Sequence, residues 1–166
     1  MVPILLILAT TLLAVDQPTD LELYTFGASY HSNRTVNWNE NNLGLGLGVA
    51  IHTDTKIDII FAGGGYKDSY NEIASFGMFG ARYVMGERKR VHATAGFMAG
   101  YYNGSGFAGV GMIPVVSIGY NWVDLCFTGS PPESGHKHNN SDDPKQNRET
   151  ESGMVAAFLK IRLCTF

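Results

Sequence analysis

The stretch LGLGLGVAIH at residues 43–52 decides the fold. Successive side chains of a strand point to opposite faces, so one face of this stretch is aliphatic and the other is largely glycine. A β-barrel in a lipid bilayer needs this division, because large apolar side chains face hydrocarbon and small ones face the interior. The expected outward residues are Leu43, Leu45, Leu47, Val49 and Ile51, and the expected inward residues are Gly44, Gly46 and Gly48.

The rest of the chain predicts the same architecture. From residue 21 onward the hydropathy pattern alternates with period two and is interrupted by turn signals, which is typical of antiparallel strands. The connections alternate between short turns and mostly longer polar loops, as in bacterial outer-membrane barrels. We therefore predict an all-β fold, an eight-stranded antiparallel transmembrane β-barrel that forms a single domain over residues 16–166. The expected strands lie near residues 21–30, 43–52, 56–65, 73–84, 91–101, 108–119, 122–128 and 154–165.

The glycine faces of residues 43–52 and 108–119 also bear on the interior of the barrel. Eight strands normally enclose an interior that side chains just fill. Two glycine-lined strands therefore suggest a cavity that could hold one slender ligand, such as an acyl chain. The alternative is that glycine only relieves crowding where the strands coil tightly.

Composition excludes several classes of function. The chain has 166 residues and a net charge of -3, which suits one compact domain and offers no basic face for nucleic acid. Its two cysteines, Cys126 and Cys164, match neither a CxxC metal spacing nor a dense disulfide framework. In the predicted barrel they lie toward opposite ends of neighbouring strands, beyond the reach of a disulfide bond, so we expect two free thiols. We expect a monomer without a cofactor.

Residues 1–15 contain no charged side chain and resemble a secretory signal peptide. The apolar run is shorter than the ~20 residues that a spanning helix requires. The sequence leaves the cleavage position open, and a buried N-terminal strand is the alternative interpretation. Together with the barrel pattern, the signal predicts a location in the bacterial outer membrane.

Residues 129–153 are polar and lack apolar periodicity, which predicts a long surface loop. Four side chains in it could in principle ligate a divalent cation. Such a loose cluster on a surface loop is far more often solvated, so we expect no metal site. These residues are His136, His138, Asp142 and Asp143.

Three polar residues are expected at the long-loop rim of the barrel. His31 ends the first strand, and Asp68 and Ser69 follow the third strand, which runs in the same direction. A histidine, a carboxylate and a hydroxyl could serve acyl transfer as a base, an orienting or charge-stabilising group, and a proton relay or nucleophile. The alternative is that Asp68 and Ser69 form an ordinary turn and His31 is an exposed loop residue.

Several stretches resemble, in order, the lipid A palmitoyltransferase family of outer-membrane barrels called PagP. Residues 30–31 (YH) resemble its aromatic-histidine pair, and residues 38–48 (WNENNLGLGLG) resemble its Asn-Glu and glycine-rich second strand. The most specific match is YKDSYN at residues 66–71, which resembles the Lys-Asp-Ser-aromatic-Asn motif of the family. Residues 112–120 (MIPVVSIGY) resemble its apolar-Pro strand. The resemblance spans most of residues 21–128.

The resemblance implies a function and functional residues. It implies transfer of a palmitoyl chain from the sn-1 position of a phospholipid donor to lipid A as acceptor, with His31, Asp68 and Ser69 as the functional side chains. It also implies that Gly80 lies at the floor of an acyl pocket and sets the chain length; the alternative is that Gly80 faces lipid or only permits tight strand coiling. Pro114 cannot donate a ladder hydrogen bond, so it could mark a laterally open seam for lipid entry; a bulge at the rim is the alternative.

Some features depart from the family. The amphipathic N-terminal helix is missing, the first loop is shorter and the loop at 129–153 is longer. The terminal Phe166 is typical of outer-membrane barrels, yet Leu159, Ile161 and Leu163 alternate out of phase with it. Two other functions stay open: a lipid A or phospholipid acyl hydrolase that uses the same rim residues, and a non-enzymatic barrel that acts through its surface loops.

Overall fold

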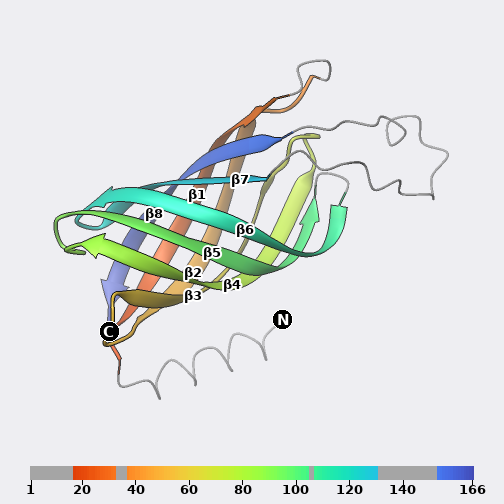
Figure 1. The fold of residues 1–166 in the computed structure, drawn as a ribbon. Coiled ribbons are helices and arrows are strands. Elements are labelled where there is room, and N and C mark those ends of the chain that lie inside the picture. The colour runs from red at the N-terminus through yellow and green to blue at the C-terminus, as the bar shows by residue number, and fades with distance from the viewer. Residues whose placement is uncertain (1–16, 33–36, 105–106, 131–152) are drawn as a thin grey trace.

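The protein is a closed, antiparallel β-barrel of eight strands (Figure 1). The computed structural model describes residues 17–32, 37–104, 107–130 and 153–166. Each strand pairs with the next, and β8 returns to pair with β1, which confirms the predicted fold class. The strands are β1 Thr19–His31, β2 Asn41–His52, β3 Ile57–Lys67, β4 Ile73–Gly86, β5 Val91–Gly104, β6 Phe107–Tyr120, β7 Val123–Ser130 and β8 Met154–Thr165.

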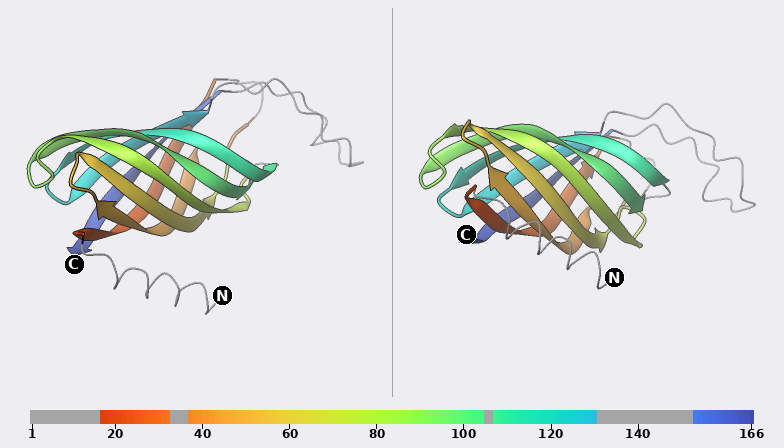
Figure 2. Two further views of the ribbon diagram at one scale, coloured as in Figure 1. Left: turned by 60° about the horizontal axis from the view of Figure 1, so that its bottom comes forward. Right: turned by 90° about the horizontal axis from the view of Figure 1, so that it is seen from below.

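The two ends of the barrel differ in their connections. The β2–β3, β4–β5 and β6–β7 connections are short and lie at the end where β1 begins and β8 finishes (Figure 2). We call this the turn end, and the opposite end, where β1 finishes and β4 begins, the loop end. Among the described residues no helix is long and apolar enough to cross a membrane. The predicted signal at 1–15 and most of the predicted loop at 129–153 lie outside the described residues.

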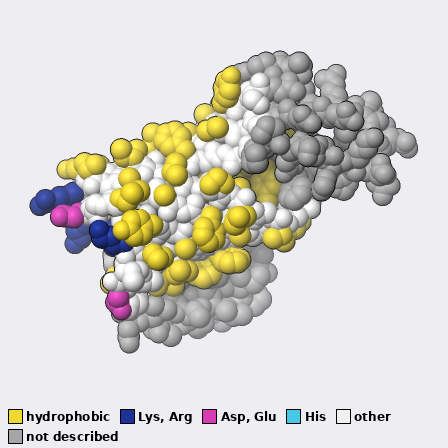
Figure 3. All heavy atoms as spheres, viewed as in Figure 1, with side chains coloured by type: hydrophobic (Ala, Val, Ile, Leu, Met, Phe, Trp, Pro, Cys, Tyr) yellow, Lys and Arg dark blue, Asp and Glu magenta, His cyan; other side chains and the backbone are white. Residues whose placement is uncertain are grey.

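The outer surface follows the alternation predicted for the leucines of β2, whereas Val49, which was also predicted to face hydrocarbon, is buried. Leu43, Leu45 and Leu47 are 64%, 63% and 56% exposed, whereas the glycines between them point inward. The same holds around the barrel, where Phe79, Phe97 and many other large apolar side chains face outward. Apolar side chains therefore cover much of the outer wall in the space-filling view, and charged ones gather at the turn end (Figure 3).

The interior has an apolar layer toward the loop end and a charged layer toward the turn end. Aromatic rings fill much of the apolar layer, and Phe26 contacts three others at centroid distances of 5.0 Å (Tyr66), 5.4 Å (Phe76) and 5.4 Å (Phe158). In the charged layer the Arg82 guanidinium lies 2.7 Å from Glu22 Oε1 and 2.9 Å from Asp58 Oδ2. A second ion pair joins Lys160 Nζ to Asp124 Oδ2 at 2.6 Å. Buried charges are tolerated when they are paired in this way.

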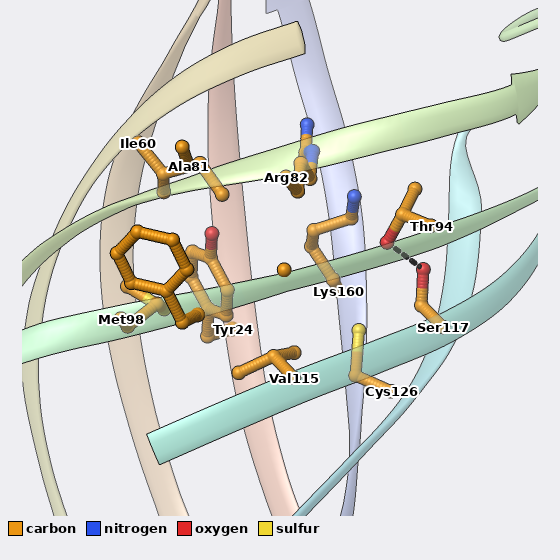
Figure 4. A pocket seen from close by; sticks show the side chains of 12 residues that line it. Tyr24, Ile60, Ala81, Arg82, Thr94, Met98, Val115, Ser117, Cys126 and Lys160 are labelled. Carbon is orange, nitrogen blue, oxygen red and sulfur yellow. Dashed lines mark hydrogen bonds between the residues drawn. The ribbon is translucent and has the colours of Figure 1, made fainter. Parts of the chain in front are cut away.

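The glycines of β2 do not leave the empty volume that their pattern suggested. A Cβ atom on Gly44 would lie 2.2 Å from Tyr66 Cβ, and one on Gly48 would lie 2.7 Å from Tyr24 Cε2. Aromatic side chains from neighbouring strands therefore occupy this space, and the prediction of an acyl-sized cavity beside these glycines is wrong. A cavity between the two layers measures only about 20 Å³ (Figure 4), compared with roughly 300–1,000 Å³ for ordinary ligand pockets.

A β-bulge in β8 explains why Phe166 alternates out of phase with the apolar residues before it. Leu21 pairs with Cys164 but Glu22 pairs with Arg162, so Leu163 is an extra residue in β8. Beyond the bulge the alternation is reset. The Thr165 hydroxyl donates to the carboxylate of buried Asp20, and Phe166 is exposed. Phe166 consequently shares the outer face with Leu159 and Ile161, which precede the bulge.

Candidate functional site

The structure brings two of the predicted rim residues into direct contact. His31 ends β1, and Ser69 lies in the turn after β3. The distance between His31 Nε2 and Ser69 Oγ is 2.8 Å, and each residue is only 5% exposed. In the tautomer protonated at Nδ1, the Ser69 hydroxyl donates to Nε2. A hydroxyl at hydrogen-bond distance from an imidazole nitrogen is the arrangement in which a histidine can act as a general base.

Asp68 shapes the turn that presents Ser69. Its carboxylate Oδ1 accepts hydrogen bonds from the backbone N–H of Tyr70 at 2.9 Å and of Glu72 at 2.8 Å. The turn places Asn71 at a φ of 70°, a left-handed conformation that asparagine tolerates. Asp68 is 1% exposed. These contacts match the turn chemistry that was the alternative interpretation of Asp68, and they hold the serine at its place.

The loop between β1 and β2 holds the same turn from the other side. Asn39 donates through its backbone N–H to the carbonyl of Ser69 and through Nδ2 to the carbonyl of Asp68, both at 2.8 Å. Asn42, at the start of β2, donates through Nδ2 to the carbonyl of Lys67 at the end of β3, at 3.0 Å. Sequence reasoning did not assign a role to Asn39 or Asn42. The signal available was the position of Asn39 within the WNENN stretch that resembles a family motif.

An aromatic side chain orients the histidine. The Trp38 ring stacks on the His31 imidazole with a centroid distance of 4.7 Å and an interplanar angle of 18°. Tyr70 packs edge-on against Trp38 at 5.3 Å. Stacking restricts rotation of the imidazole and shields one of its faces from solvent. The site is therefore a buried His31–Ser69 pair held between two loops.

Gly80 lies inside the barrel at the boundary between the two interior layers. It pairs with Ile60 on β3 and with Met98 on β5, and the next inward residue on β4 is Arg82 of the charged layer. A Cβ atom on Gly80 would lie 2.0 Å from the Phe97 carbonyl oxygen. Gly80 thus lies at the end of the apolar layer, and its nearest neighbours are backbone atoms of β5.

The pairing of β6 with β7 stops beside Pro114. The ladder runs from Tyr120↔Val123 to Val115↔Thr128, and the Thr128 hydroxyl donates to the Pro114 carbonyl at 2.8 Å. Among the described residues, 107–114 of β6 have no partner on β7, although they remain paired with β5. Within the described residues, the β6–β7 side of the wall is therefore unpaired from Pro114 toward the loop end.

The cysteines and the candidate metal ligands are not part of the His31–Ser69 pair. Cys126 is buried and Cys164 is exposed, and both are free thiols, which confirms the prediction that they are not bridged. Among the described residues no group of three or more histidine, cysteine or carboxylate side chains could hold a metal ion. The loop residues His136, His138, Asp142 and Asp143 lie outside the described residues.

Comparisons with known proteins give similarities among solved structures. No family model matches the chain, and no curated protein matches it. Among solved structures it is similar to the crystal structure of Ail, the attachment invasion locus protein of Yersinia pestis, with a TM-score of 0.48 and 10% sequence identity. That match covers 92% of this chain and 100% of Ail.

Proposed function

We propose that this protein is a bacterial outer-membrane barrel that transfers a palmitoyl chain from a phospholipid to lipid A. Membrane insertion is supported by the closed strand order and by the exposed aliphatic and aromatic residues of the outer wall. A barrel satisfies its backbone hydrogen bonds internally, and an apolar exterior with buried charges inside suits a hydrocarbon surrounding. In this orientation the turn end faces the periplasm and the loop end faces outward.

The observation that favours acyl transfer is the 2.8 Å contact between His31 Nε2 and Ser69 Oγ. In ester exchange, a hydroxyl loses its proton as its oxygen attacks the carbonyl carbon, and the departing alcohol gains a proton. His31 takes the first proton and returns it to the leaving oxygen. Ser69 is either the attacking hydroxyl, with an acyl-serine intermediate, or the relay that passes the proton from the lipid A hydroxyl to His31.

The route for the acyl chain follows from two further positions. The segment of β6 at residues 107–114 has no β7 partner among the described residues, and lipid enters the barrel laterally there. Gly80 ends the apolar layer directly beside the charged layer, so a chain that enters from the loop end stops there. In the structure the rings of Phe26, Phe76 and Phe158 fill this layer. Binding of an acyl chain in this layer therefore requires these side chains to change conformation and vacate the space.

Mass spectrometry of lipid A from cells that express the chain tests the proposal. Lipid A with one added acyl chain supports transfer, and lipid A with one chain fewer supports hydrolysis. Unchanged lipid A would favour a non-enzymatic barrel that acts through its loops. Ser69→Ala should abolish the added chain, whereas Ser75→Ala, on the exposed face of β4, should not.

A further inference from the structure

A second recess lies at the turn end, opposite the His31–Ser69 pair. It measures about 490 Å³ and is bounded by the β4–β5 turn, the β6–β7 turn and the last residues of β8. We call it the turn-end groove. Its lining includes Lys89, Asn121, Trp122, Ile161, Arg162 and Leu163.

The groove arises because β8 is longer than its partner. The β7–β8 ladder begins at Val123↔Ile161, so the last residues of β8 extend beyond β7. The backbone N–H of Arg162 donates to the Trp122 carbonyl at 2.8 Å, which fixes the β6–β7 turn against this extension. The bulge at Leu163 lies in the same segment. Bulges re-aim side chains and often occur beside functional surfaces.

The lining of the groove favours a negatively charged ligand. It contains two cationic side chains, Lys89 and Arg162, and no carboxylate. Arg162 Nε lies 2.7 Å from Asp20 Oδ2, so this cation is held in place. Lys89 is exposed, and among the described residues it has no ion-pair partner. One anchored and one unpaired cation therefore flank the groove.

The apolar side of the groove favours a lipid. Trp122 is 54% exposed and Leu163 is 50% exposed, and Ile161 lies beside them on the outer face. Tryptophan is enriched where the headgroup region of a membrane meets the hydrocarbon, and membrane-facing lysine and arginine attract anionic headgroups.

We propose that the turn-end groove binds an anionic phospholipid, with its phosphate between Lys89 and Arg162 and its acyl chains against Ile161 and Leu163. The proposal rests on the membrane location proposed above and is independent of acyl transfer. In this proposal the periplasmic side of the barrel has a separate lipid-binding site, formed by strand β8 and the neighbouring turns.

Native mass spectrometry of the full-length detergent-solubilised barrel tests this site, with dioleoylphosphatidylglycerol as the anionic probe and dioleoylphosphatidylcholine as the zwitterionic one. The wild type should retain phosphatidylglycerol more strongly. Lys89→Ala should lower this retention about fivefold, the loss expected for one interfacial cation. Lys56→Ala removes another exposed lysine, in the β2–β3 turn, and should leave retention unchanged.

Two results would overturn the proposal: equal retention of both lipids by the wild type, or equal losses in Lys89→Ala and Lys56→Ala. Trp122→Ala provides a second variant that leaves the Asp20–Arg162 pair intact, and it should also weaken retention. Heat-dependent gel migration of the same samples tests barrel formation separately. A folded barrel without preference for phosphatidylglycerol would contradict this site alone, whereas a wild type without a folded barrel would contradict the membrane location as well.

Discussion

The backbone N–H of Asn39 donates a 2.8 Å hydrogen bond to the carbonyl oxygen of Ser69. This bond joins the loop after β1 to the turn after β3, across the end of the intervening strand β2. The relative position of His31 and Ser69 therefore depends on two loops that contact each other, as well as on the strands that precede them. Changes in either loop should affect the His31–Ser69 contact.

A closed barrel in a membrane should show heat-modifiable migration. The ladder between β1 and β8 closes the wall, so the folded protein should resist unfolding by detergent until it is heated. We expect unheated and boiled samples to run at different positions in a denaturing gel, and the protein to fractionate with outer membranes. Identical migration together with recovery in the soluble fraction would contradict the membrane barrel.

Ser69→Ala should abolish acyl transfer without unfolding the barrel. The change removes the hydroxyl that contacts His31 Nε2, and loss of an acid-base or nucleophilic group typically lowers a rate by about 10²–10⁴-fold. The rate is measured with purified protein, a dipalmitoyl phospholipid and lipid A. Heat-modifiability should persist, because only one hydrogen bond is lost. Full activity of the variant would remove Ser69 from the mechanism.

Asn39→Ala should lower kcat more than it changes KM. The variant loses the Nδ2 hydrogen bond to the Asp68 carbonyl but keeps the backbone bond to Ser69. A loss of about 1 kcal/mol in positioning corresponds to a rate several-fold to tenfold lower. Asn103→Ala, on the exposed face of β5, is the control and should be neutral. If kcat and the unfolding midpoint were both unchanged, Asn39 would have no positioning role.

Gly80→Ala should weaken the barrel and shorten the preferred donor chain. A Cβ atom at this position meets the Phe97 carbonyl oxygen at 2.0 Å and Met98 Cα at 2.8 Å, so β4 and β5 must shift. Overpacking of this kind costs about 1–3 kcal/mol in the free energy of unfolding. Urea titration measures the stability, and chain-length profiling of transferred acyl groups measures the selectivity.

Gly77→Ala is the matched control for Gly80. It lies on the same strand but faces outward, and a Cβ atom there would have no neighbour within 4 Å. It should leave stability and chain length unchanged. An unshifted chain-length profile in a folded, active Gly80→Ala protein would falsify the assignment of Gly80 as the chain-length residue.

Arg82→Met should destabilise the barrel strongly. Arg82 pairs with both Glu22 and Asp58 in the interior, so its removal leaves two buried carboxylates without this partner. Breaking a buried pair in this way typically costs about 3–5 kcal/mol. Urea titration of the folded barrel provides the measurement. Arg90→Ala, which breaks only the exposed pair with Glu87, should have little effect, and equal losses in both variants would contradict a special role of the charged layer.

The sequence by itself determined the strands and their facing. Alternation in residues 43–52 is a local property, because successive side chains of a strand must point to opposite faces. The strand count and the alternating connections then placed His31 and Ser69 at the same rim, since β1 and β3 run in the same direction. Both inferences need only the chain direction and the period of two, and the structure agrees with them.

Only the tertiary structure decided how the interior is filled and how the wall closes. Arg82 meets Glu22 across 60 residues of sequence, and the rings beside Gly44 and Gly48 come from other positions in the wall. The bulge at Leu163 and the end of the β6–β7 ladder at Val115 likewise depend on how neighbouring strands are staggered. Stagger is a property of the closed sheet as a whole, because the register of every pair must be compatible with closure of β8 onto β1. No local pattern in the chain encodes that condition.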